Sequence, residues 1–147
     1  LAGEHPDQEA FRGALGCCQR LYRSLDPETQ RSDAGLGVLR VQAEIIEDAS
    51  RWFPLDKEFM YRRSYTQYLL GNAEQAQEYA ERFRLYFPEH VGNLMVLVET
   101  ALRLRKTHKA GLVLDDLTRC DPGNVHLEGF RARLEALRAG RPGSGRA

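Results

Sequence analysis

The sequence lacks an excess of charge of either sign, because 21 Lys and Arg side chains balance 21 Asp and Glu side chains. Proteins that bind nucleic acid or anionic membranes by charge carry a basic excess, so the composition argues against both partners. No apolar run approaches the roughly 20 residues that a membrane-spanning helix needs, and no signal-peptide pattern opens the chain. The missing initial Met and the Gly-rich end at 140–147 indicate a piece of a longer protein.

Cysteine is scarce as well, with three residues in the chain, two of them the neighbours Cys17 and Cys18. Adjacent cysteines form a disulfide only with strain, and this number and spacing do not make a disulfide framework. The sequence therefore favours reduced thiols, as found in the cytoplasm or the nucleus.

Patterns for a metal, a cofactor or covalent catalysis are also missing. Metal-binding sequences pair histidines three to five residues apart or contain Cys-x-x-Cys, and no histidine here has such a neighbour. The histidines are His5, His90, His108 and His126. The glycines at 140–145 follow a helical pattern and precede no further element, so they do not form a phosphate loop. We therefore predict a protein that is not an enzyme and that binds no cofactor and no metal.

What the sequence does contain is a helical pattern, clearest at 57–88. Apolar residues recur with helical period over 58–70 and again over 73–87. Between them, Gly71-Asn72 predicts a tight turn, because Gly accepts a positive φ and Asn caps the following helix. This stretch is therefore expected to form two adjacent antiparallel helices.

The same pattern recurs at a fixed spacing. Pro54, Pro88 and Pro122 lie 34 residues apart, and each closes a helical pattern. Ala76 and Ala110 share this offset, and a small side chain at such a position lets two helices approach closely. Helix pairs repeated at a fixed period bury a continuous core by stacking on one another.

The rest of the chain is also predicted to be helical, which gives about seven helices and no strand. Gly35 and Gly37 should fray the start of the second helix, because each costs roughly 1 kcal/mol relative to Ala. Trp52 and Leu112 are expected on the buried sides of their helices. The further helices are predicted at 7–25, 33–53, 92–105, 109–120 and 125–139.

In these features the chain resembles the tetratricopeptide-repeat family over about residues 34–139. Two departures from the family pattern are Phe83, where a small residue is usual, and Arg105, where the turn glycine is expected. The resemblance is carried by Gly71-Asn72, Ala76 and Pro88 in one copy, and by Leu94, Leu97, Ala110 and Pro122 in the next.

The resemblance implies an all-α, right-handed α-solenoid of stacked antiparallel helix hairpins. It implies a single domain at 1–139 with an atypical first hairpin at 7–54. Repeats at 57–88 and 91–122 and a capping helix at 125–139 follow, with a flexible tail at 140–147.

By the same resemblance, the first helices of the repeats line a groove. Tyrosine offers a large rigid surface with one hydrogen-bonding group, which suits a binding face. The alternative interpretation is that the tyrosines pack against helices of the neighbouring repeats, and the sequence leaves both open. The candidate binding residues are Glu58, Tyr61, Arg62, Tyr65, Tyr68 and Leu69 on one helix, with Met95, Glu99, Leu102 and Arg103 on the next.

These observations favour a non-catalytic scaffold that binds a protein partner, either a peptide or helix or another part of the parent chain. Arg62, Glu99 and Arg103 would set the register of that partner. An apolar, aromatic groove suits an amphipathic helix or an extended apolar peptide. Two alternatives stay open: a self-assembly element that forms a homo-oligomer through Leu15, Leu21 and Tyr22, and a regulatory or docking part of a larger enzyme.

Overall fold

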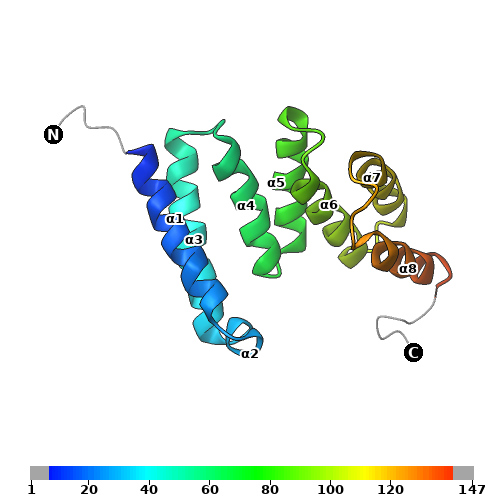
Figure 1. Cartoon of the computed structure of the whole chain (residues 1–147), viewed down its shortest axis with the longest axis horizontal. Coiled ribbons are helices and arrows are strands. Elements are labelled where there is room, and N and C mark those ends of the chain that lie inside the picture. Colours follow the sequence, from blue (N-terminus) through cyan, green and yellow to red (C-terminus); the bar gives the residue numbers. More distant parts are fainter. Residues whose placement is uncertain (1–6, 141–147) are drawn as a thin grey trace.

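The computed structural model describes residues 7–140, which fold into helices joined by turns and short connections, with no strand in this range (Figure 1). Residues 1–6 and almost all of the predicted tail at 140–147 lie outside the described residues. In chain order the helices are α1 (Gln8–Ser24), α2 (Pro27–Gln30), α3 (Asp33–Trp52), α4 (Lys57–Leu69), α5 (Ala73–Tyr86), α6 (Val91–Arg103), α7 (Thr107–Cys120) and α8 (Leu127–Arg138).

The long helices form three hairpins that follow one another along the molecule (Figure 1). In each hairpin the two helices pack on one another, α1 with α3, α4 with α5 and α6 with α7. Successive hairpins pack through α3 on α4 and through α5 on α6, and α8 packs against α6 and α7. The prediction of an all-helical stack of hairpins is confirmed, and the short helix α2 adds an eighth helix to the seven expected.

The 34-residue period is present in the backbone. The residue before each of the three prolines ends a helix with φ between −131° and −144° and ψ between 65° and 74°. Each of these residues donates its amide hydrogen to the carbonyl four residues earlier, at 2.8–3.0 Å. Ala76 and Ala110 are fully buried, and each is the fourth residue of its helix. The two alanines therefore occupy equivalent places in successive hairpins, as predicted.

The hairpin turns keep one geometry although their sequences differ. Gly71 has φ +86° and Arg105, 34 residues later, has φ +59°. Asn72 donates its amide to the Gln67 carbonyl at 2.9 Å, and Lys106 donates to the Ala101 carbonyl at 2.8 Å. Positive φ costs a non-glycine residue roughly 1–2 kcal/mol, so the packing of the hairpin holds Arg105 in a conformation that Gly71 adopts freely.

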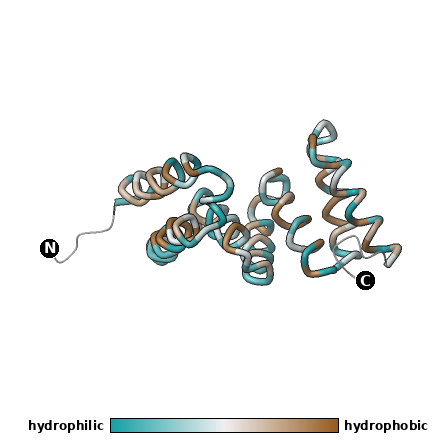
Figure 2. The backbone as a smooth tube through the Cα atoms, turned by 90° about the horizontal axis from the view of Figure 1, so that it is seen from below, coloured by the Kyte–Doolittle hydropathy of each residue, from teal (hydrophilic) through white to brown (hydrophobic). Residues whose placement is uncertain are grey.

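Burial differs from the sequence prediction at three apolar residues. Trp52 and Leu112, expected to be inward, are 53% and 55% exposed, because each helix is covered on only part of its circumference. In Figure 2, hydrophobic residues (brown) and hydrophilic residues (teal) alternate along the helices. Leu15, expected on an open self-assembly surface, is fully buried with Ile46 and Phe59 between α1, α3 and α4.

The fraying expected at Gly35 is also absent. The residue lies inside α3 and is buried, because α2 packs on this part of the helix. None of the helices described between residues 7 and 140 has the length and apolarity needed to cross a lipid bilayer.

A pair of polar side chains is buried at two successive hairpin junctions. Gln42 of α3 donates its amide to Thr66 Oγ1 of α4 at 2.8 Å. Gln77 of α5 lies 3.5 Å from Thr100 Oγ1 of α6. All four side chains are at most 4% exposed. The Gln42–Thr66 hydrogen bond helps to fix how the second hairpin sits on the first, because a buried amide without a partner is costly. The Gln77–Thr100 contact is at the limit of hydrogen-bonding distance, and Gln77 Oε1 also accepts from Lys106 Nζ at 2.7 Å.

Thr66→Val should therefore destabilise the protein by about 1–3 kcal/mol, since it strands the Gln42 amide in the core. The double variant Gln42→Leu with Thr66→Val should recover much of this loss, because both polar groups are then gone. Urea denaturation of the two single variants and the double variant measures the coupling. Strictly additive losses would show that the hydrogen bond contributes nothing.

Candidate functional site

Three tyrosines of α4 form one aromatic ladder. Tyr61, Tyr65 and Tyr68 are spaced four and three residues apart, which places them on the same side of a helix. The ring centroids of Tyr61 and Tyr65 are 5.8 Å apart with the rings stacked at 15°, and those of Tyr65 and Tyr68 are 6.1 Å apart at 30°. All three are partly buried against the core that α6 contributes. The ladder thus runs along the contact between α4 and α6, which are the first helices of the second and third hairpins.

Tyr61 closes one end of the ladder against the next hairpin. Its ring lies 4.6 Å from the His90 ring and 5.8 Å from the Phe83 ring. A Cβ on Gly92 would come within 2.6 Å of the Tyr61 hydroxyl, so only a glycine leaves room for it there. Burial, with a smaller contribution from Tyr65, raises the pKa of Tyr61 to about 12. Its hydroxyl is therefore neutral at physiological pH, and most of its ring packs between hairpins.

Tyr68 ends the other side of the ladder beneath a cation. The guanidinium carbon of Arg103 lies 4.4 Å from the centroid of the Tyr68 ring. Arg103 is exposed, and no carboxylate among residues 7–140 forms an ion pair with it. The ladder therefore presents Tyr65, Tyr68 and a cation with free hydrogen-bonding capacity side by side.

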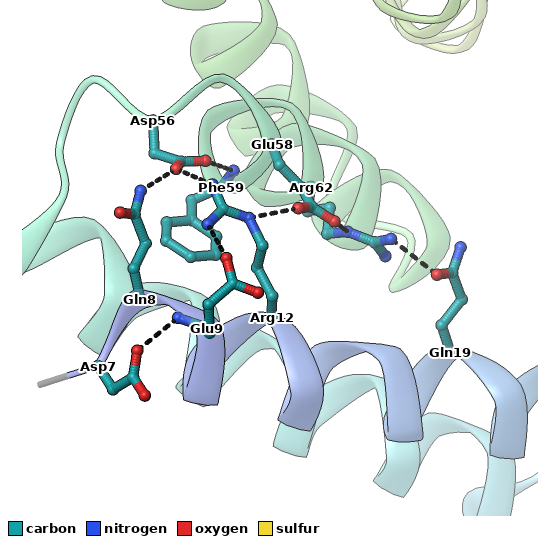
Figure 3. Close-up of polar contacts among 9 residues, drawn as sticks. All are labelled: Asp7, Gln8, Glu9, Arg12, Gln19, Asp56, Glu58, Phe59 and Arg62. Carbon is teal, nitrogen blue, oxygen red and sulfur yellow. Dashed lines mark hydrogen bonds and ion pairs between the residues drawn. The ribbon is translucent and has the colours of Figure 1, made fainter.

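Glu58 and Arg62 connect α4 to α1 in the structure (Figure 3). Glu58 accepts from Nε of Arg12 and from Nε of Arg62, each at 3.0 Å. Arg62 also donates through Nη2 to Gln19 Oε1 at 2.7 Å. Both predicted site residues already have partners within the chain, so they are less free than Arg103 to engage another protein.

On α6, the remaining predicted residues contact α8, the turn that precedes it or the core. Glu99 forms an ion pair with Arg133 at 2.9 Å. The Met95 sulfur lies 3.5 Å from the Asn124 amide nitrogen. Leu102 is only 4% exposed, so its expected place on an open binding face is wrong. It packs in the core because it sits where α6 meets the other helices of the C-terminal cluster.

Sequence reasoning missed the role of His90. Its Nδ1 accepts the Asn93 amide hydrogen at 3.0 Å, which makes it the N-cap of α6. Burial, and then the ammonium group of Lys57, lower the pKa of His90. A histidine two residues after a proline that ends a helix was the available signal.

We therefore expect acid to weaken this cap. Protonation of Nδ1 removes the acceptor and adds a positive charge at a helix N-terminus, which the helix dipole disfavours. Because the folded-state pKa is lowered, the contribution is fully present above the unfolded value of about 6.5 and is lost as the pH falls through the folded one. Urea midpoints between pH 7.5 and 5 should fall more for the wild type than for His90→Asn, whose amide oxygen can cap without titrating. Parallel pH profiles would contradict the assignment.

Among the described residues, neither the partly buried thiol of Cys18 nor any metal-binding cluster indicates catalysis. Cys17, Cys18 and Cys120 are free, and burial, with a contribution from Cys17, raises the pKa of the Cys18 thiol. A raised pKa opposes formation of the nucleophilic thiolate. Between residues 7 and 140, no group of three or more His, Cys, Asp or Glu side chains could hold a metal ion. The chemistry that the ladder supports is non-covalent: aromatic contact and a guanidinium that can pair with an oxygen acceptor.

Comparison with solved structures identifies a protein of similar fold. A thermophilic TPR protein from Thermus thermophilus, solved by crystallography, is similar to this chain with a TM-score of 0.67 and 24% sequence identity. The similarity covers 88% of this chain and 66% of the Thermus chain, so the present chain spans slightly less than two thirds of that protein. No protein-family model matches the sequence, and no curated protein shows significant similarity to it.

Proposed function

We propose that this chain, which has the fold of a tetratricopeptide-repeat protein, is a non-catalytic scaffold that binds a segment of a partner protein along the tyrosine ladder. Proteins of this fold generally serve as protein-interaction scaffolds. The observation that carries the proposal for this chain is the ladder of Tyr61, Tyr65 and Tyr68, which ends under the guanidinium of Arg103, a group with no ion-pair partner among residues 7–140.

The ladder favours a partner with an apolar surface and a nearby oxygen acceptor. Tyrosine and arginine are among the side chains that most often dominate the energetics of protein interfaces. Tyr65 and Tyr68 would contribute aromatic contact area, and Arg103 would pair with a carboxylate or a backbone carbonyl of the partner. Because Arg62 and Glu99 already pair within the chain, Arg103 is the strongest candidate for setting the register.

Selection of a displayed library of random dodecapeptides on the immobilised protein tests this proposal. We expect the selected peptides to lose more than 1 kcal/mol of binding free energy, about fivefold or more in Kd, to Tyr65→Ala. Tyr61→Ala should weaken binding as well, but its ring also packs on Phe83 and His90. The ring contacts of Tyr65 are with the other two ladder tyrosines, so Tyr65→Ala is the decisive variant, with Kd measured at a temperature at which circular dichroism shows the variant to be folded.

Leu112→Ala provides the matched control. Leu112 is exposed on α7 and is separate from the ladder, so its removal should leave Kd unchanged. Fluorescence anisotropy with labelled peptides gives Kd for each variant. If every selected peptide binds Tyr65→Ala as tightly as it binds the wild type, the ladder is not the binding site.

Self-assembly is the second candidate, supported by the exposed Leu21 on α1, of which 53% is accessible. The burial of Leu15 reduces the surface first considered, leaving Leu21 and the partly buried Tyr22. Light scattering separates the candidates: a dimer that dissociates on Leu21→Ser would favour assembly, and a monomer would favour the ladder.

A further inference from the structure

A hollow of about 300 Å³ lies away from the tyrosine ladder, between the end of α3 and the C-terminal part of α5. The turn between α3 and α4 forms one of its sides. Its apolar lining consists of Pro54, Leu55, Met60, Tyr79, Leu85 and Tyr86. This volume is at the lower end of the range for small-molecule sites, and it is large enough for one bulky side chain.

Three of the large apolar residues around this hollow are unusually open to solvent. Leu55 is 64% exposed, Leu85 is 82% exposed and Tyr86 is 56% exposed. Single exposed apolar residues are ordinary, but several gathered around one depression are typical of an interaction site. Leu55, Leu85 and Tyr86 thus form a candidate contact surface that is separate from the tyrosine ladder.

The position of the hollow on α4 separates it from the ladder. Successive residues of a helix are about 100° apart, so Met60 and Arg63 point roughly 100° and 160° away from Tyr61. Both residues line the hollow. A ligand in the hollow and a ligand on the ladder would therefore contact different sides of α4.

The charged side chains that line the hollow, among the residues described, are Arg63 and Arg82. Their guanidinium carbons lie 4.0 Å and 6.0 Å from the centroid of the Tyr79 ring. Arg63 is held by two hydrogen bonds to Glu47, at 2.6 and 2.8 Å. Two guanidinium groups thus stand beside the apolar lining, Arg63 paired with Glu47 and Arg82 paired with Glu78.

Arg82 is the one of the two that can change partners at little cost. Its ion pair with Glu78 joins residues one helical turn apart, and the side chains are 59% and 55% exposed. Exposed pairs of this kind contribute little to stability. A carboxylate brought by a ligand could replace Glu78 and would be less exposed to solvent once the hollow is filled.

We propose that this hollow is a second binding site, which takes a bulky apolar side chain of a partner peptide that carries an Asp or Glu close to it in sequence. The apolar side chain fills the space between Leu55, Leu85 and Tyr86. The carboxylate pairs with Arg82. Arg82 therefore selects an acidic occupant, and the apolar residues of the hollow hold its bulky side chain.

The test uses the full chain carrying Tyr65→Ala and Arg103→Glu, so that peptides recognising the ladder are removed. A displayed library of random dodecapeptides is selected on this variant, and Kd is measured for the enriched sequences. We expect an aromatic or Leu residue close to an acidic one, a tenfold or greater loss of affinity on Leu85→Ser, and a similar loss on Arg82→Glu. Replacing the acidic residue of the peptide by Lys should restore binding to Arg82→Glu.

Arg131→Glu on α8 is the matched charge-reversal control, since Arg131 is exposed and distant in sequence from the hollow. Leu85→Ser, Arg82→Glu and Arg131→Glu should each leave the melting temperature of this Tyr65→Ala, Arg103→Glu background unchanged. Three results would overturn the proposal: no enriched peptide, peptides indifferent to both Leu85→Ser and Arg82→Glu, or a dimer of the chain that Leu85→Ser dissociates. The last would mean that a second copy occupies the hollow.

Discussion

Replacing Gly35 by alanine should destabilise the protein by about 2–3 kcal/mol, as expected for a methyl group forced into a packed site. A Cβ at this position would overlap the carbonyl of Gln30 and come within 2.6 Å of the Gln30 Cα. These are backbone atoms of α2, which cannot rotate away as a flexible side chain could. The variant can fold only if α2 moves off α3.

Gly37, two residues later in the same helix, is the matched control. A Cβ there would meet nothing within 4 Å. Gly37→Ala should therefore stabilise the protein by about 0.5–1 kcal/mol, through the higher helix propensity of alanine. The two substitutions make the same chemical change in one helix, and only the surroundings differ.

Urea denaturation followed by circular dichroism measures both changes, with equal m-values as the sign that the unfolding transition is comparable. Proteolysis at the connection around α2 should be faster in Gly35→Ala than in the wild type. Stabilisation by both substitutions would mean that α2 does not pack on α3 in solution.

Asp56→Ala should be the second strongly destabilising change, at roughly 2–3 kcal/mol. The Asp56 side chain is only 6% exposed and caps α4 by accepting the Phe59 amide hydrogen at 3.1 Å. The same carboxylate binds Arg12 and Gln8 of α1 (Figure 3). One side chain thus begins a helix and ties the first hairpin to the second.

Asp56→Asn separates these roles. Its amide oxygen can still cap α4, but it cannot form an ion pair with Arg12. We expect Asn to lose clearly less stability than Ala, and we expect the Asn variant to become less sensitive to salt than the wild type. Thermal and urea unfolding at low and high ionic strength provide the comparison. Equal losses for Asn and Ala would show that the ion pair, rather than the cap, accounts for the whole effect.

The repeat geometry could be predicted from sequence because it depends on local backbone chemistry. Proline forces the residue before it out of the helical region, so Pro54, Pro88 and Pro122 mark helix ends wherever they occur. Gly71 marks a turn for the same kind of reason. Arg105 shows the limit, because its positive φ has no local signal and follows only from its offset to Gly71.

Burial was harder to predict, because periodicity shows which side of a helix is apolar but not how much of it a neighbour covers. Trp52 and Leu112 lie on apolar faces and are exposed, whereas Leu102 lies on the expected groove and is buried. Helix propensity alone makes Gly35 a weak point of α3, although it is the position at which α2 packs. Each error concerns a contact between separate elements of the fold.

In the candidate site, too, features within one helix could be predicted and contacts between separate helices could not. The spacing of Tyr61, Tyr65 and Tyr68 was enough to place them on one side of α4. Their partners His90, Gly92 and Arg103 come from the next hairpin, so their pairing could not be derived from α4 alone. The polar contacts of Glu58 and Arg62 with α1 depend in the same way on how hairpins meet.

The buried Gln–Thr pairs limit which hairpins can be added to or removed from the stack. At the third junction, positions offset by 34 from Gln77 and Thr100 hold Gly111 and Leu134, and an added Cβ on Gly111 would touch Leu134 at 3.8 Å. Hairpins are therefore not interchangeable modules. Duplicating residues 57–90 would present Gln77 to a new Thr66 and preserve a matched contact. Deleting 91–124 would leave the Gln77 amide facing Leu134, so the molecule should tolerate growth at its centre better than loss of its third hairpin.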